Sequence, residues 1–265
     1  MTTHLLLIDA LNLIRRIYAV DSQQSGNDKS LAIKNTFSRV QNAVRKLLKQ
    51  SKATHSIAVF DGEKSWRFHY YPLYKQSRKP MPCELANALP QLYKAFSDLG
   101  ISVYVPQHDE ADDVISTLAS KASCNKIKST IVSTDKGFLP LLNEHIAVYD
   151  YFKSVFMSSR DVMSKFSLTH LQLIDFWALS GDKTNDIPGV SGIGKQGAIN
   201  LLTQFESVEN ALNCETPPVE LKRVLNKLND NYDDYIRAKL LVTLRQDINL
   251  GFSLKALRLT SFQYE

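Results

Sequence analysis

Short apolar runs alternate with longer helical patterns through the first 150 residues. Five runs rich in β-branched residues predict strands at 4–10, 56–62, 102–106, 129–135 and 145–151. They are almost continuously apolar, as is typical of parallel strands that are covered on both faces. Amphipathic patterns at about 30–50 and 84–99, and a third from about residue 110, predict helices between them. This alternation predicts an α/β fold built on an open parallel sheet.

Beyond residue 160 the pattern becomes helical throughout. Residues 169–180 predict an amphipathic helix, and a glycine-rich turn at 181–197 follows it. Further helical patterns occupy 201–212, 220–230 and 235–246, and 215–219 reads as a surface loop. We therefore expect a catalytic α/β domain over residues 1–160 and an all-helical domain over 161–265.

The composition narrows the class of protein. The chain of 265 residues is 44% hydrophobic and 22% charged, which excludes a disordered or fibrous protein. Three widely spaced cysteines do not match a zinc site or a disulfide framework, and they favour a reducing, cytoplasmic compartment. No apolar run approaches the roughly 18 residues of a membrane span, and the N-terminus does not read as a signal peptide. A net charge of +5 suits a polyanionic partner.

Acidic residues gather where predicted strands end. They are Asp9, Asp61 and Asp135, together with the group Asp109, Glu110, Asp112 and Asp113 that follows the 102–106 strand. The carboxyl ends of parallel strands share one edge of a sheet, which is where ligands bind. Carboxylates gathered without basic partners repel each other, so a divalent cation is expected to hold them. Mg²⁺ or Mn²⁺ suits oxygen ligands, and the absence of nearby His or Cys argues against zinc.

Each of these acids also has an ordinary structural interpretation. An acid in the first turn of a helix is favourable without any ligand, and an Asp after a strand is often a turn former. Four such sites on one edge favour the metal site. Two Mg²⁺ ions about 4 Å apart are a recurring arrangement for phosphodiester hydrolysis.

A basic and aromatic segment follows the second predicted strand. Within residues 64–79 the cations are Lys64, Arg67, Lys75, Arg78 and Lys79, and the rings are Trp66, Phe68, Tyr70, Tyr71 and Tyr74. Cations for phosphates with rings for bases is the composition of a single-strand-binding element, which would lie over the acidic edge. The alternative is a solvated loop whose rings pack beneath it. We favour phosphate contact for Lys75 and Arg78.

The glycine-rich run 189–195 nearly matches a phosphate-binding P-loop. A P-loop needs Ser or Thr after the Lys and a buried strand before the first Gly. Gln196 stands after Lys195 here, and residues 186–188 (Asp-Ile-Pro) precede the run, so a nucleotide-binding P-loop is disfavoured. A hairpin between two helices fits better, with main-chain N–H groups facing duplex phosphates. A plain packing turn is the alternative.

Six motifs occur in the order found in a known family. They are LLLIDALNLIRR, AVFDGE, YKQSRKPMP, DEADD, VSTDKG and GDKTNDIPGVSGIGKQGA. With them the chain resembles the 5′ nuclease domain of bacterial DNA polymerase I and its phage relatives, and most of all the stand-alone Xni (exonuclease IX) branch. The resemblance implies a PIN-like α/β domain with an arch or gateway over 64–82, a helix–three-turn–helix subdomain, and cleavage of 5′ single-stranded flaps at their junction with duplex DNA.

The resemblance also implies a role for individual residues. It places Asp9, Asp61, Glu110, Asp112 and Asp113 at a first metal site, with Asp112 central, and Asp135 and Asp182 at a second. It implies that Lys75 and Arg78 approach the scissile phosphate, that Arg16 lies near the site, and that Tyr74 is a gateway tyrosine. It implies K⁺ bound by the carbonyls of Leu179, Ser180, Pro188, Val190 and Ile193. Residues Gly192, Ile193, Gly194, Lys195, Gln196 and Gly197 would then face the duplex.

Two departures concern the second metal site. Gly137 and Asn185 stand where relatives with a full site have Asp, and Asp186 is one place beyond the ligand position. Each missing carboxylate removes attraction for Mg²⁺, so we expect one firm ion and a second, weaker one.

The expected protein is thus a Mg²⁺-dependent flap endonuclease, monomeric on branched DNA. A DNA-binding protein with a decayed nuclease site and a PIN-type ribonuclease remain as alternatives.

Overall fold

A six-stranded sheet organises the first part of the chain. The computed structural model describes residues 3–62 and 64–259. The strand order is β3-β2-β1-β4-β5-β6. The strands are β1 His4–Asp9, β2 His55–Val59, β3 Ser102–Tyr104, β4 Lys128–Val132, β5 Ile146–Asp150 and β6 Val155–Met157. β1 to β5 are parallel, and β6 pairs antiparallel with β5. The predicted parallel sheet is confirmed.

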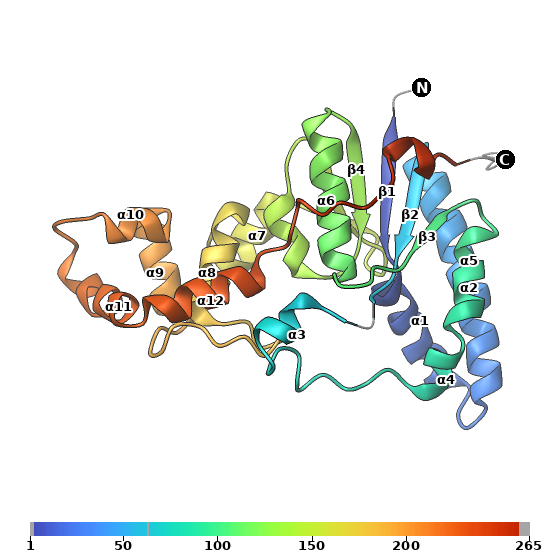
Figure 1. Ribbon diagram of the computed structural model, residues 1–265, viewed down its shortest axis with the longest axis horizontal. Coiled ribbons are helices and arrows are strands. Elements are labelled where there is room, and N and C mark those ends of the chain that lie inside the picture. Colours follow the sequence, from blue (N-terminus) through green and yellow to red (C-terminus); the bar gives the residue numbers. More distant parts are fainter. Residues whose placement is uncertain (1–2, 63, 260–265) are drawn as a thin grey trace.

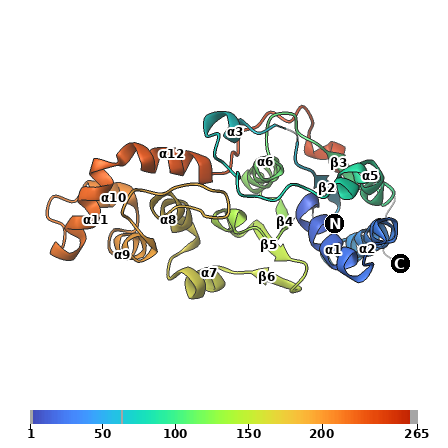
Figure 2. The ribbon, with the colours of Figure 1, turned by 90° about the horizontal axis from the view of Figure 1, so that it is seen from below.

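Helices cover both faces of the sheet (Figures 1 and 2). They are α1 Ala10–Gln24, α2 Lys29–Ser51, α4 Cys83–Asn87, α5 Leu89–Ser97, α6 Ala111–Cys124 and the 3₁₀ helix η1 Lys136–Leu141. The short helix α3 Trp66–Tyr70 lies apart from the sheet. Alternate residues of β1 face opposite layers: Leu6 and Ile8 pack with α1, α2 and α5, whereas Leu5 and Leu7 pack with α6. Burial on both faces explains the unbroken apolar runs of these strands.

A helical lobe extends from one end of the sheet (Figure 1). It contains α7 Ser159–Phe166, η2 His170–Gln172, α8 Leu173–Ser180, α9 Lys195–Phe205, α10 Val208–Leu212, α11 Val219–Asp230 and α12 Tyr232–Val242. Helices α8 to α12 share a separate core, which includes Leu179, Leu201, Leu202 and Leu228, whereas Val162 of α7 packs in the sheet core on the α6 face. No helix of the described residues is long and apolar enough to cross a membrane.

Helices α1, α3 and η1 and strand β6 were not predicted from the sequence. α1 follows β1 without a break, because Asp9 ends the strand and its side chain accepts from Asn12 N to cap the helix. The apolar residues of its first turn continue those of the strand, which hides the change of period. β6 has only three residues, and two of them are exposed.

The chain after α12 returns to the sheet. The predicted helix over 235–246 ends at Val242, and the residues beyond it are extended except for η3, Leu254–Leu257. Ile248, Leu250 and Leu257 are buried in the core on the α6 face. Leu259 N donates to Thr54 O beside β2. In Figure 1 this red segment runs past α6 to the neighbourhood of β2.

We expect Leu257→Ala to lower the free energy of unfolding by about 2–4 kcal/mol, because it empties part of the α6-face core. Leu257 is 3% exposed. Urea unfolding measures the change. Leu171→Ala is the matched control, since Leu171 is 73% exposed and its loss should cost about 0.5 kcal/mol or less. Equal losses in the two variants would contradict the packing described for the returning segment.

Candidate active site

Four carboxylates face one another where the strands end. Asp9 is the last residue of β1, Asp61 and Asp135 follow β2 and β4, and Asp112 lies in the first turn of α6. The negative charges of Asp9, Asp61 and Asp135 all act on Asp112. The expected convergence of these four acids on one edge of the sheet is therefore present in the structure. We call them the four-carboxylate cluster.

Three members of this cluster also have structural roles. The carboxylate of Asp9 caps α1 and accepts from Ser133 Oγ at 2.8 Å. Asp61 Oδ1 accepts from Ala111 N at the start of α6, and Asp135 Oδ1 accepts from Gly137 N at the start of η1. A structural role was expected for an Asp that follows a strand, and these three acids have one as acceptors for main-chain N–H groups at helix starts; that role does not exclude metal binding. The caps fix the carboxylates in place while leaving oxygen lone pairs for a ligand.

Burial and mutual repulsion raise the pKa values of two acids in the cluster. Burial, reinforced by the charge of Asp61, raises the pKa of Asp9 to about 7. Burial and the charges of Asp9, Asp135 and Asp61 raise the pKa of Asp112 well above its usual value, against the opposing charge of Lys75. A carboxyl group with so high a pKa lacks a sufficient positive partner. A divalent cation is the kind of ligand that would supply one.

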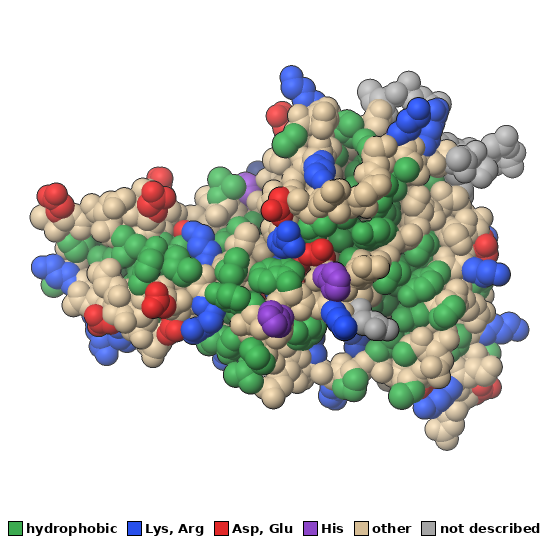
Figure 3. All heavy atoms as spheres, in the orientation of Figure 1, with side chains coloured by type: hydrophobic (Ala, Val, Ile, Leu, Met, Phe, Trp, Pro, Cys, Tyr) green, Lys and Arg blue, Asp and Glu red, His purple; other side chains and the backbone are tan. Residues whose placement is uncertain are grey.

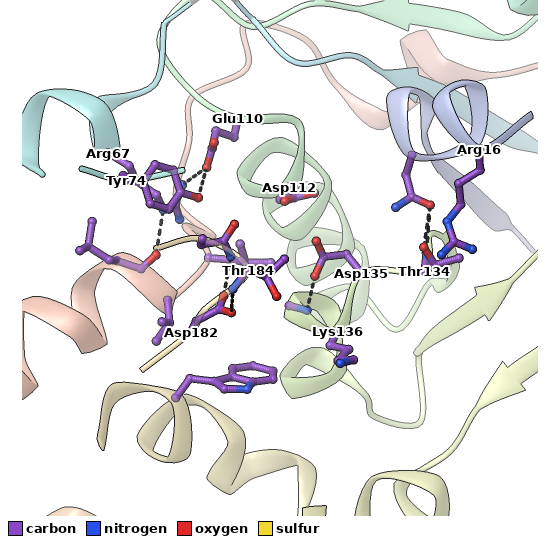
Figure 4. Close-up of a pocket in the computed structure, with 17 residues that line it drawn as sticks. Arg16, Arg67, Tyr74, Glu110, Asp112, Thr134, Asp135, Lys136, Asp182 and Thr184 are labelled. Carbon is purple, nitrogen blue, oxygen red and sulfur yellow. Dashed lines mark hydrogen bonds and ion pairs between the residues drawn. The ribbon is translucent and has the colours of Figure 1, made fainter. Parts of the chain in front are cut away.

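Two acids of the cluster, Asp112 and Asp135, line a cavity between the sheet and the helical lobe. The cavity has a volume of about 330 Å³ and is lined by Asn12, Arg16, Arg67, Tyr74, Glu110, Asp112, Thr134, Asp135, Lys136, Gly137, Trp177, Asp182, Thr184, Asn185, Leu241, Val242 and Leu244. In Figure 4, Arg67, Tyr74 and Glu110 lie on one side and Arg16 and Thr134 on the other, with Asp112 and Asp135 between them. Asp182 enters from the helical lobe, so both parts of the chain contribute acids.

The residues of the cavity suit Mg²⁺ in chemistry. Their donors are carboxylate and amide oxygens, with no His or Cys in the lining. Within residues 3–62 and 64–259, no three His, Cys, Asp or Glu side chains are close enough to hold one ion together. The carboxylates would therefore have to come closer together to hold one ion jointly.

The guanidinium of Arg67 lies beside this cavity and is almost completely buried. It donates to Glu110, to both carboxylate oxygens of Asp113, and to the main-chain oxygens of Leu241 and Thr243. Although burial opposes its charge, Asp113 and Glu110 raise the pKa of Arg67 above its usual value. The side chain joins α3, the start of α6 and the end of α12. The interpretation of Arg67 as a DNA-contacting cation is therefore wrong.

The same interaction divides the acids at the start of α6 into two groups. Asp113 is fully buried, and its oxygens accept from Arg67, Trp66 Nε1 and Arg245 N. Glu110 accepts from Arg67, Tyr74 and Lys75. Asp109 pairs with Arg245. Of these acids, the structure places Asp112 in the cluster. Asp113 binds Arg67 instead, and Glu110 lies at the cavity between Arg67 and Lys75.

Lys75 and Arg78 both connect the arch segment, residues 64–82, to other parts of the protein. Tyr74 is only 4% exposed and its hydroxyl donates to Glu110, so its ring is packed in the protein and not presented to a base. Lys75 Nζ binds Glu110, and Arg78 Nη2 donates to Asn185 Oδ1 at 2.7 Å. Both cations thus reach the cavity side of the arch. Phe68 and Tyr70 remain exposed.

The residues at the depleted second site have protein partners. Asn185 Nδ2 donates to Asp182 Oδ2, so this amide joins Asp182 to Arg78. Asp186 accepts from Ser77 N and Ser77 Oγ in the arch, so its carboxylate does not replace the missing ligand. Gly137 offers no side-chain oxygen, and a Cβ there would lie 3.2 Å from Asp135 Oδ1. Asp135 and Asp182 are the acids left in this part of the cavity.

The glycine hairpin between α8 and α9 brings main-chain groups close together. A Cβ on Gly189 would lie 2.3 Å from the carbonyl oxygen of Leu179, and Gly181 adopts a φ of 79° that favours glycine. Leu179 and Val190 carbonyls each accept one main-chain hydrogen bond and retain a second lone pair. Such a turn of carbonyls suits a K⁺ ion. No strand precedes the hairpin, in agreement with its exclusion as a P-loop.

The end of the hairpin presents free main-chain donors. Gly194 caps α9 without a side-chain hydrogen bond, and a Cβ there would meet nothing within 4 Å. Lys195 and Gln196 are exposed in the first turn of the helix. Ile193 is 6% exposed and packs in the lobe core, so only its main chain faces outward. Phosphates fit such a helix N-terminus.

Comparison with known families identifies the class of protein. Residues 4–167 match the model of the 5′-3′ exonuclease N-terminal resolvase-like domain, and residues 168–265 match the 5′-3′ exonuclease C-terminal SAM fold. The chain belongs to the 5′-3′ exonuclease family and is a nuclease. Both the predicted fold and the predicted family are confirmed.

Similar individual proteins point to one branch of the family. Flap endonuclease Xni of Pseudoalteromonas translucida is 56% identical over 98% of this chain and 100% of its own length. Flap endonuclease Xni of Psychromonas ingrahamii is 46% identical over 98% of each chain. The predicted resemblance to this stand-alone branch is confirmed.

Solved structures share the fold. The T5 5′-exonuclease with bound divalent zinc superposes with a TM-score of 0.72, at 21% identity, over 90% of this chain and 89% of that chain. A bacteriophage T5 flap endonuclease in a pseudo-enzyme–product complex with DNA and metal ions gives 0.70, at 22% identity, over 91% and 89%.

We expect Arg67→Met to lower the free energy of unfolding by about 3–5 kcal/mol, because it leaves the buried Asp113 charge without its partner. Urea unfolding monitored by circular dichroism measures the change. The matched control is Arg237→Met, which breaks a half-exposed i,i+3 pair with Asp234 and should cost about 1 kcal/mol or less. A loss below about 1 kcal/mol for Arg67→Met would show that the guanidinium does not hold these segments together.

Proposed function

We propose that this chain is a Mg²⁺-dependent flap endonuclease, which cuts 5′ single-stranded flaps at their junction with duplex DNA. The observation that carries the proposal is the four-carboxylate cluster, unneutralised and open to a cavity between the sheet and the helical lobe. The Xni relatives are named flap endonucleases, and this chain matches 98% or more of their length, which supports the same activity. Divalent ions bound there would activate water and stabilise the leaving oxygen of the phosphodiester.

Each side of the cavity has a separate task in this proposal. Asp9, Asp61 and Asp112 hold the first ion, with Glu110 at its edge, while Asp135 and Asp182 hold the second. Lys75 and Arg78 stabilise negative charge on the phosphate, because they lie on the arch next to Glu110 and Asn185. Arg16, which is exposed on the opposite wall, binds the same strand.

The helical lobe holds the duplex. Residues Gly192–Gly197 receive phosphates at the start of α9, without reading the base sequence. K⁺ bound by the Leu179, Ser180, Pro188, Val190 and Ile193 carbonyls would stiffen that turn. We place residues 1–160 as the catalytic domain and 161–265 as the DNA-binding domain, acting as a monomer in the cytoplasm. Free cysteines at 83, 124 and 214 agree with a reducing compartment.

The first test is cleavage of a labelled 5′-flap DNA over a Mg²⁺ series. The wild type should cut at the junction, and Asp112→Asn should lower the rate at least about 10³-fold, because it removes the acid that faces the other three. Flap binding without Mg²⁺ should persist in the variant.

Asp98→Asn is the control for this test, since it removes an exposed acid at the C-cap of α5, away from the cavity. Tight flap binding with no cleavage by the wild type at any Mg²⁺ concentration would favour the decayed-nuclease alternative. The observation in favour of that alternative is that Gly137 and Asn185 replace two acids of the second metal site. Preferential cleavage of RNA flaps would favour the ribonuclease alternative.

Restoring the two missing acids should strengthen the second ion site. We expect Gly137→Asp/Asn185→Asp to lower the Mg²⁺ concentration for half-maximal flap cleavage at least about threefold, since each carboxylate adds attraction for the ion. Gly137→Asn, which adds nearly the same volume without charge, is the control and should leave that concentration unchanged. An unchanged midpoint in the double variant would mean that the ion does not depend on these positions.

A further inference from the structure

Three lysines gather beside the cavity, outside the machinery described above. Lys136 is the first residue of η1, Lys153 lies in the turn between β5 and β6, and Lys165 is near the end of α7. All three side chains are exposed. Lys165 Nζ lies 5.7 Å from the centroid of the Phe166 ring, which packs against Trp177 of the cavity lining. Partial burial and the charges of Lys136 and Lys153 lower the pKa of Lys165. Three separate segments thus present their ammonium groups at one place.

This cluster is not neutralised by the protein. Within residues 3–62 and 64–259, none of these three lysines forms an ion pair with a carboxylate. Adjacent like charges repel, and flexible lysine side chains on a surface normally separate to avoid it. On the face that carries α3 and α12, by contrast, lysines and arginines are spread among apolar side chains (Figure 3). The lysine cluster therefore matches a bound anion.

Its position indicates which anion. Lys136 directly follows Asp135 and lines the same cavity, on the side away from the arch residues Arg67 and Tyr74 (Figure 4). Arg16, also at the cavity, lies 5.2 Å above the Phe152 ring, next to Lys153 in the sequence. Figure 2 shows α7 and β6 on the side of the molecule opposite α3. A nucleic-acid strand crossing the cavity from the arch side would leave it over these lysines.

We propose that Lys136 and Lys165 bind a phosphodiester of the cleaved strand adjacent to the one at the four-carboxylate cluster, with Lys153 extending the same surface. The inference rests on the proposed function and adds a strand-binding site on the wall opposite the arch. Lys136 is the residue next to Asp135, and both line the same cavity, so a phosphate bound by Lys136 would be a near neighbour of the one at the cluster. Lysine suits this role because it binds phosphate as a point charge, without bidentate geometry and without reading bases.

The binding experiment compares wild type with Lys136→Ala/Lys165→Ala by fluorescence anisotropy on a labelled 5′-flap DNA, without Mg²⁺ and over a salt series. We expect about tenfold weaker binding at 0.1 M salt, and a salt dependence of log K that is shallower by about 1 to 2, because fewer counterions are released. Lys128→Ala/Lys255→Ala is the matched control. Lys128 begins β4 and Lys255 lies in η3 beside β2, both at the opposite end of the sheet, so binding should not change.

A second measurement locates the contact. Methylphosphonate linkages, which lack the phosphate charge, are placed singly at each of the three positions on either side of the scissile linkage. Wild type should lose affinity at a linkage next to the scissile one, and the double variant should show no further loss there. Equal losses in the two proteins at every position would overturn the proposal, and so would unchanged affinity of the double variant for the unmodified flap.

Thermal unfolding separates a binding role from a structural one. The double variant should melt at the same temperature as wild type or slightly above it, because repulsion between the two ammonium groups is relieved. A clear drop in Tm would overturn the proposal in favour of a packing role. If inorganic phosphate stabilises wild type but flap affinity is the same in both proteins, the cluster is a small-anion site and the proposal fails. Absence of flap cleavage by the wild type would instead contradict the proposed function.

Discussion

The buried guanidinium of Arg67 is the interaction on which the arrangement of the active site depends. Its partners come from the first turn of α6 and from the main chain where α12 ends. Through this one side chain the base of the arch, the acidic turn and the helical lobe have a fixed relation to each other. A buried charge with that many donors satisfied holds geometry more than it adds stability. The lobe therefore meets the sheet at a defined place, and the cavity between them has a defined shape.

The same interaction explains why equivalent acids behave differently. Glu110 and Asp113 are three residues apart, so they lie on one face of the start of α6 and both reach Arg67. Asp112 lies on another face and meets Asp9, Asp61 and Asp135, and burial together with their charges raises its pKa. In one short run of acids, Glu110 and Asp113 are thus paired with Arg67 on one side of the helix. Asp112 on the other side belongs to the cluster that has no such partner. The separation of these roles follows from helical periodicity.

Much of this site could be predicted from the sequence, because its signals are local. The five parallel strands are apolar runs, and an acid that follows such a run must lie at the carboxyl edge. The division of the acids on α6 was also accessible, since spacing of three residues sets a shared face. The role of Arg67 could not be predicted, because its main-chain partners are 174 and 176 residues away in the sequence and no sequence pattern connects them. Composition instead suggested a DNA contact, since a buried arginine and an exposed one look the same in a sequence.

The return of the chain from α12 to the sheet has a consequence for how the protein is made. Ile248, Leu250 and Leu257 complete the core on the α6 face, although they follow the whole helical lobe in the sequence. During synthesis the part of this core that they cover stays exposed until these residues leave the ribosome, long after β1 and α6 have emerged. Contacts between such distant segments form slowly, and uncovered apolar surface is prone to aggregation. The nascent nuclease domain is thus expected to depend on a chaperone, or on rapid completion of the chain, while its helical lobe can fold ahead of it.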